Sequence, residues 1–123
     1  MCCKIDRQRS LMELDKLKKK GRKTITVYKA LDKVCDDKSV RTPFTRKIFK
    51  VGDTINVRCK RHMPAPGDVY KGGEVSSGGV HVYLEKPFSA YADFVIKVLV
   101  PIDDFIGCDY LGRHAVLRKL TIP

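Results

Sequence analysis

The sequence predicts a single α+β domain, with an N-terminal helix and a largely antiparallel sheet of about five to six strands. Three observations support this fold class. The 123 residues are enough for one domain and not two. A helical pattern occurs near the N-terminus, and short β-branched runs then follow one another with few helical segments between them. A doubly wound parallel fold needs more crossover helices than this chain offers.

The N-terminal helix is expected from about Leu11 to Lys20. Residues 1–9 are predicted to be a mobile basic lead-in, and residues 10–123 the globular domain. Ser10 and Glu13 match a capping box, in which the hydroxyl and the carboxylate satisfy free amides at a helix start. The spacing of Leu11, Leu14 and Leu17 gives the helix one apolar face, and Gly21 can supply its left-handed end.

Six segments are expected to be strands because they are β-branched, alternating or strongly apolar: 24–31, 46–49, 54–59, 80–84, 95–100 and 115–122. Ile25 and Val27 would share the inward face of the first. The second and third are predicted to pair as a hairpin around the turn at 51–53. The segment 95–100 is the most apolar and is expected to be central.

The remaining segments are interpreted as connections. Residues 60–79 contain three prolines or glycines followed by two glycine pairs, which predicts a long irregular loop. Pro87 would begin a short helix at 87–94. Residues 102–106, with Asp103 and Asp104, are predicted to be a tight turn or 3₁₀ segment.

The formal net charge of +11 lies in the first half of the chain. Residues 1–23 hold nine basic and three acidic side chains, and residues 24–62 hold ten and four, whereas residues 63–123 hold six and seven. This asymmetry favours an anionic partner, either a nucleotide-like small molecule or nucleic acid, although it also serves solubility. The sequence is also compatible with a homo-oligomer.

The five cysteines indicate a reducing compartment. Their number is odd and no pair has C-x-x-C spacing, so free thiols are expected and neither a metal nor another cofactor is predicted. A site combining some of them with His62, His81 or His114 is the alternative. No apolar run has the length of a membrane span or a signal peptide, so a cytoplasmic protein without a membrane partner is expected.

Two features suggest a site for an anion. The glycine pairs 72–73 and 78–79 would let backbone amides approach a phosphate. The alternative is a flexible loop, since the pairs fit neither the phosphate-loop pattern nor the dinucleotide-binding pattern. A cationic wall is expected from side chains whose guanidinium or ammonium groups can bind phosphate: Arg41, Arg46, Arg58, Lys60 and Arg61. A solvated strand edge is the other interpretation.

His81 and Tyr83 are two residues apart in one strand, so both side chains point to the same face. With Tyr28 on another strand they could stack on a base and hydrogen-bond to it, or form a packed sheet face with satisfied polar tips. No catalytic residues are predicted. The pairs Asp36–Asp37 and Asp103–Asp104 are typical of turns, and no nucleophile elbow is present.

Several segments together resemble small uncharacterised proteins encoded by phages, bacteria and large DNA viruses. They are VYKAL (27–31), RTPF (41–44), FKVGDT (49–54), GVHVY (79–83) and the ending 98–122. Some small viral proteins sequester nucleotide immune signals of the host. A compact basic domain with a glycine-rich loop would suit that role, so a nucleotide-binding protein in a host–virus setting, in the host cytoplasm, is expected.

The order of elements also resembles that of ADP-ribosyltransferase-like folds. In those folds a first strand carries Arg or His, a middle strand Ser or Tyr, and a late strand a catalytic Glu. Lys29 stands near the first position and His81 or Tyr83 near the second. The late segment 113–119 contains no Glu, which implies an inactive transferase.

Three functions follow as hypotheses. The first is a non-enzymatic binding protein for a nucleotide or cyclic oligonucleotide, with the cationic wall on phosphate and with His81 and Tyr83 on the base. The second is non-specific binding of nucleic acid or an acidic protein through the basic segment 4–23. The third is a degenerate enzyme of the transferase-like fold.

Overall fold

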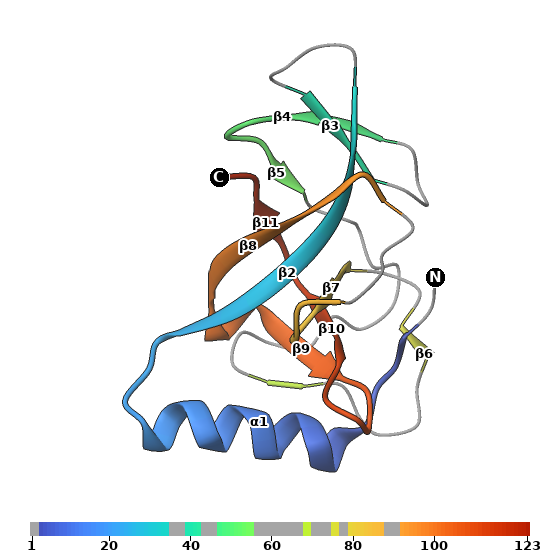
Figure 1. The fold of residues 1–123 in the computed structure, drawn as a ribbon. Helices are drawn as coiled ribbons and strands as arrows, with labels where there is room; N and C mark the ends of the chain where they lie inside the picture. The colour runs from blue at the N-terminus through green and yellow to red at the C-terminus, as the bar shows by residue number, and fades with distance from the viewer. Residues whose placement is uncertain are drawn as a thin grey trace.

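The computed structural model describes residues 3–34, 39–42, 47–55, 68–69, 75–76, 79–87 and 92–123. In these ranges the chain has one α-helix, one 3₁₀ helix and eleven short or long strands (Figure 1). In chain order they are β1 (Cys3–Lys4), α1 (Arg7–Lys19), β2 (Thr24–Lys33), β3 (Ser39–Arg41), β4 (Ile48–Lys50), β5 (Thr54–Ile55), β6 (Val75–Ser76), β7 (Val80–Tyr83), β8 (Phe94–Pro101), η1 (Ile102–Asp104), β9 (Phe105–Cys108), β10 (His114–Leu117) and β11 (Leu120–Thr121).

The predicted α+β class is confirmed. One helix accompanies a seven-stranded main sheet, and every strand pairing in the described chain is antiparallel. The main sheet runs β4-β3-β2-β7-β10-β9, with β8 also on β2, and two small ribbons (β1-β6 and β5-β11) flank it. Helix α1 lies across one end of the molecule and the β3–β4 ribbon across the other (Figure 1).

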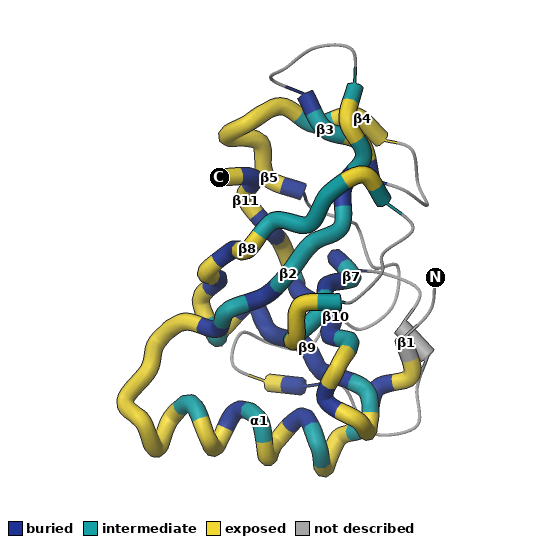
Figure 2. The backbone as a smooth tube through the Cα atoms, viewed as in Figure 1, coloured by how far each residue is buried: buried dark blue, intermediate teal, exposed yellow. Residues whose placement is uncertain are grey.

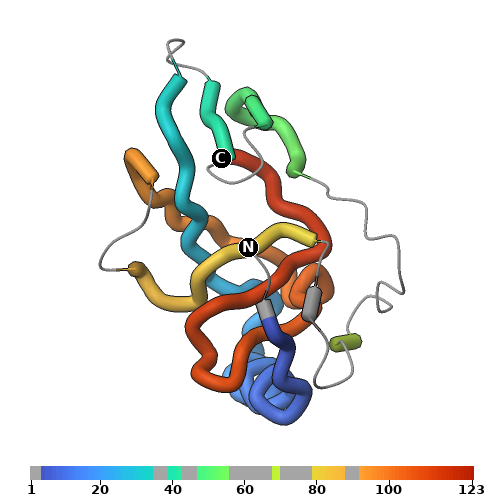
Figure 3. The backbone as a smooth tube through the Cα atoms, turned by 90° about the vertical axis from the view of Figure 1, so that its right-hand side faces the viewer, coloured from blue at the N-terminus to red at the C-terminus, as the bar shows by residue number. Residues whose placement is uncertain are grey.

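Strand β2 is the centre of the main sheet. Strand β8 pairs with it over eight residues, from Thr24 opposite Pro101 to Leu31 opposite Phe94. Strand β7 meets β2 at Tyr28, and β3 pairs with it from Asp32 onward. Figure 3 shows β8 and β3 on opposite sides of the upper part of β2.

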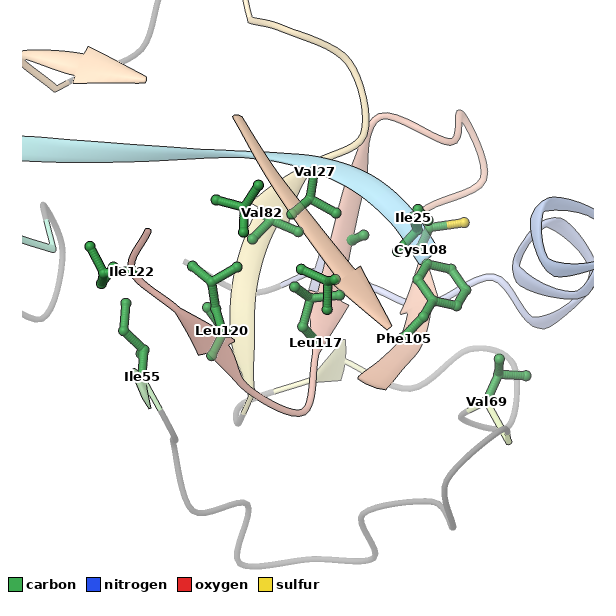
Figure 4. Packing of buried hydrophobic residues seen from close by; sticks show 14 of the residues in the cluster. Ile25, Val27, Ile55, Val69, Val82, Phe105, Cys108, Leu117, Leu120 and Ile122 are labelled. Atoms are coloured by element: carbon green, nitrogen blue, oxygen red, sulfur yellow. The ribbon is translucent and has the colours of Figure 1, made fainter. Parts of the chain in front are cut away.

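The core forms on the face of β2 that sequence alternation predicted. Ile25 and Val27 are buried, whereas Thr24 and Thr26 on the opposite face are exposed or half-buried. Figure 4 shows the buried side chains of β2, β7, β9 and β10 meeting beneath this strand. We call the face of the main sheet that carries Thr24, Thr26 and Tyr28 the outer face.

Helix α1 begins earlier than the capping box predicted. Asp6 is the N-cap and its Oδ1 accepts the Arg9 amide at 2.8 Å. Ser10 is instead fully buried inside the helix, where its Oγ donates to the Asp6 carbonyl at 2.6 Å and accepts the Cys108 amide at 2.9 Å. A buried hydroxyl is favourable only with such partners. The helix ends as predicted, with Gly21 at a φ of 68°.

Residues 5–9 therefore belong to the domain, and the prediction of a mobile lead-in through residue 9 is wrong for them. Ile5 is 1% exposed and packs over Gly107, where a Cβ would lie 2.6 Å from Ile5 Cγ2. The Asp6 amide donates to the Cys108 carbonyl at 2.8 Å. Packing of Ile5 and the hydrogen bond of Asp6 thus attach the chain to β9 before the helix starts.

Three strand predictions need correction. The expected hairpin of 46–49 with 54–59 is wrong, because β4 pairs with β3 and β5 pairs with β11. Strand β8 is not central: among the described strands it pairs with β2 alone, and its Leu99 is 66% exposed. The segment 115–122 is divided into β10 and β11 by Arg118 and Lys119.

The predicted turn at 102–106 is confirmed in its first half as η1, but Phe105 already starts β9. Of the predicted helix at 87–94, residues 88–91 lie outside the described residues, and the prediction is wrong at its end because Phe94 already begins β8. Most of the loop at 60–79 also lies outside the described residues. Of that loop, Gly79 is buried at a φ of 83°, and a Cβ there would lie 2.5 Å from Val116 Cγ1. Close packing against β10 explains this glycine without any ligand.

Candidate nucleotide-binding face

Four side chains form one line across the outer face of the main sheet. Tyr28 of β2 is paired directly with Lys97 of β8 on one side and with Tyr83 of β7 on the other. Tyr83 is in turn paired with His114 of β10. Directly opposed residues of antiparallel strands point to the same face. We call Lys97, Tyr28, Tyr83 and His114 the transverse row.

Burial shows that the transverse row faces away from the core. Each member has a buried neighbour along its strand, on the opposite face: Val27, Val82, Val98 and Ala115. Lys97 is exposed, and Tyr28, Tyr83 and His114 are half-buried residues. Figure 2 colours much of β2 teal, which marks half-buried residues. Half-buried rings are held in place by their neighbours and still offer part of a face to a ligand.

The end of the row at His114 is ordered by an aromatic contact and a carboxylate. The Tyr83 and His114 ring centroids lie 4.9 Å apart, with the planes inclined at 50°. Asp109 Oδ2 lies 3.2 Å from His114 Nδ1, and Asp109 Oδ1 accepts the Arg113 amide at 2.9 Å. The carboxylate therefore shapes the turn before β10 and fixes the tilt of the imidazole, whose side chain stays 40% exposed.

His81 lies on the same face as Tyr83, as the two-residue spacing predicted, and is paired with Val116 of β10. Burial, helped by the positive charges of Lys29 and His114, lowers the pKa of His81 to about 4. At neutral pH the imidazole is uncharged. It can accept or donate a hydrogen bond, but it does not attract phosphate by charge.

Lys29 occupies the place where β2 parts from β7. Its Nζ donates to the His81 carbonyl at 2.8 Å, two residues beyond the Tyr28–Tyr83 pair. The ammonium thus provides a hydrogen-bond donor for the His81 carbonyl at a point where β2 and β7 no longer pair. Burial lowers the pKa of Lys29 from 10.5 to about 8, because a desolvated cation is disfavoured.

Arg41 is the member of the predicted cationic wall that the described chain contains. It is paired with Asp32 of β2, on the outer face, and its Nη2 lies 3.8 Å from Asp32 Oδ2. Ala30 is the small residue between Tyr28 and Asp32 on that face, so nothing bulky on β2 separates the row from Arg41. Arg46, Arg58, Lys60 and Arg61 lie outside the described residues.

The structure thus brings together Tyr28, Tyr83 and His81, and adds two residues that sequence reasoning missed. His114 and Lys97 join the row only through strand register, and no local motif marks them. Within the described ranges no group of three His, Cys, Asp or Glu side chains is placed to hold a metal ion. Asp103 and Asp104 lie in η1, where one is exposed and the other buried, so they form no acid–base pair.

No protein-family model, no curated protein and no solved structure matches this chain. No helix in the described part of the chain is long and apolar enough to cross a membrane.

Proposed function

We propose that the outer face of the main sheet binds a ligand that combines an aromatic base with phosphate. Mononucleotides, cyclic oligonucleotides and single-stranded nucleic acid share this chemistry. The observation that carries the proposal is the transverse row, in which three rings and one ammonium are aligned across four neighbouring strands.

The rings supply the base-binding half of the proposal. Stacking of a base on an aromatic side chain contributes about 1–3 kcal/mol and tolerates every base, because each base has a π-face. Tyr28 and Tyr83 present two such rings side by side, and Tyr hydroxyls add donors and acceptors. His114 and neutral His81 add hydrogen-bonding groups on the same face.

The cations supply the phosphate-binding half. The exposed Lys97 ends the row on β8, and Arg41 of β3 lies on the same face, opposite Asp32 further along β2. The Arg41–Asp32 pair is long at 3.8 Å, and the Arg41 side chain is 44% exposed, so a phosphate can compete for the guanidinium. The net charge of +11 would draw such an anion to the protein.

The test compares ring removal with ring retention. We expect Tyr28→Ala/Tyr83→Ala to weaken binding of a fluorescent oligothymidylate of about eight nucleotides by at least about tenfold, since two stacking contacts disappear. Tyr28→Phe/Tyr83→Phe keeps both rings and should retain affinity within about threefold. Unchanged affinity in a folded Ala double variant would overturn the proposal.

A further inference from the structure

The end of helix α1 carries a second cationic surface. Lys18, Lys19, Lys20, Arg22 and Lys23 are all exposed, and no acidic residue occurs from Lys16 to Lys23. We call these five residues the helix-end cluster. Cations in a last helical turn complement the helix dipole, but Arg22 and Lys23 lie beyond the helix, so the dipole does not account for them.

The helix-end cluster leads directly into the outer face. Lys23 immediately precedes β2, and its carbonyl accepts the Ile102 amide at 3.1 Å, which fixes this point beside the end of β8. Thr24 and Thr26 then continue along the outer face to Tyr28. At about 3.3 Å per strand residue, Lys23 and Tyr28 are about 16 Å apart.

The surface between the two sites suits a polymer. Thr24 and Thr26 offer hydroxyls, and Leu99, paired with Thr26, is 66% exposed and apolar. A stacked strand rises about 3.4 Å per nucleotide, so about five linked nucleotides span the path from the cluster to the row. A single nucleotide on the row does not reach the cluster.

We infer that the ligand of the outer face is a single-stranded nucleic acid, whose bases lie on the transverse row and whose backbone continues to the helix-end cluster. This inference rests on the proposed function and narrows it. The cluster adds phosphate contacts in line with the stacking rings, which is the combination found where proteins bind single strands without sequence preference. A free nucleotide would bind to the transverse row without contacting the helix-end cluster.

Charge reversal at the cluster and away from both binding regions tests the inference. Lys19→Glu/Lys20→Glu alters the cluster. The control, which we call the ribbon variant, is Lys33→Glu/Lys119→Glu, which makes the same charge change at two exposed lysines, one at the end of β2 on the face opposite Arg41 and one directly before β11. We expect the cluster variant to bind an oligothymidylate of about ten nucleotides at least about tenfold more weakly at ~0.1 M salt. The ribbon variant should stay within about threefold, and binding of thymidine monophosphate should be equal in both.

The outcomes separate the two claims. If thymidine monophosphate binds as tightly as the oligomer and the cluster variant behaves like the ribbon variant, the inference fails while the base-binding face stands. If the oligomer needs the cluster but ignores Tyr28→Ala/Tyr83→Ala, both claims fail and the cluster is a plain polyanion surface. Binding of phosphatidylserine vesicles through the cluster, with no oligomer binding, also overturns the inference.

Discussion

The imidazole of His114 rests against the phenol ring of Tyr83, with 4.9 Å between their centroids and an inclination of 50° between their planes. The two residues are 31 positions apart in the chain and meet because β10 pairs with β7 in a register that sets them directly opposite each other. Asp109 holds the far side of the imidazole at 3.2 Å. This small assembly ends the transverse row and would orient it toward the ligand proposed above.

Removing the Asp109 carboxylate should loosen that assembly. Asp109→Ala leaves the Arg113 amide and His114 Nδ1 without this acceptor, so we expect a loss of about 1–2 kcal/mol in unfolding free energy and a several-fold loss of oligonucleotide affinity. Asp109→Asn keeps an acceptor oxygen and should recover most of both. Ring ¹⁵N shifts of His114 report the tautomer directly, and identical shifts in wild type and Asp109→Ala would contradict a positioning role.

Lys29 should give the protein a stability that rises in alkaline solution. Its folded pKa of about 8 lies below the unfolded value of 10.5, so between these pH values the unfolded chain binds more protons. Unfolding free energy therefore increases with pH across that window, by up to about 3 kcal/mol for this group. Below about pH 8 the cost of burying the ammonium is fully present.

Urea unfolding between about pH 8 and 10 checks this, with Lys29→Met as the variant and exposed Lys33→Met as the control. The rise should vanish in Lys29→Met and persist in Lys33→Met. Burial raises the pKa of Cys108 to about 11, which lowers stability above pH 9. Because that effect is common to all three proteins, it cancels in the comparison.

Gly79 should tolerate no side chain. Its φ of 83° is strained for other residues, and a Cβ would lie 2.5 Å from Val116 Cγ1 and 2.9 Å from the Leu117 carbonyl oxygen. We expect Gly79→Ala to lower the unfolding free energy by at least about 2 kcal/mol. Gly52→Ala shares the positive φ but meets nothing within 4 Å, so denaturant midpoints should show a smaller loss there. Equal losses would mean that packing against β10 is unimportant.

Ser10 should prove a structural residue of the helix–sheet contact. Ser10→Ala removes the acceptor of the buried Cys108 amide, and leaving that group unsatisfied costs about 1–3 kcal/mol. Thr54→Ala deletes a hydroxyl pair with Thr121 at 3.0 Å on the surface, and should change stability by less than about 0.5 kcal/mol. Chemical denaturation of the two variants distinguishes the cases, and a near-neutral Ser10→Ala would refute the role.

Local pattern was sufficient for the fold class and for the inward face of β2. Alternation placed Ile25 and Val27 in the core because strand side chains change face at every residue. The sequence pattern did not show how many other strands each strand pairs with in the sheet. The apolar run in β8 buries Val98 and Val100 against the core, yet it leaves Lys97 and Leu99 in solvent because they point to the outer face, and β2 is its one partner among the described strands.

The candidate site, like the fold, was predictable only where it depends on a single strand. The two-residue spacing of His81 and Tyr83 showed that they share a face, since that depends on one strand alone. The membership of Lys97 and His114 depends on three pairings between strands far apart in the chain, and register of this kind is set by the whole sheet. The helix start was misjudged because Ser10, a plausible cap, serves as a buried link to Cys108 instead.

The most direct test of the base-binding face is an NMR titration of the protein with oligothymidylate, followed through the ring protons of Tyr28, Tyr83 and His114. Stacked bases shift the resonances of the rings they cover. The account predicts that these three rings show the largest changes and give intermolecular contacts to base protons. Ring resonances that stay unmoved while the oligomer binds would show that the ligand lies elsewhere and that the transverse row is only a packed sheet face.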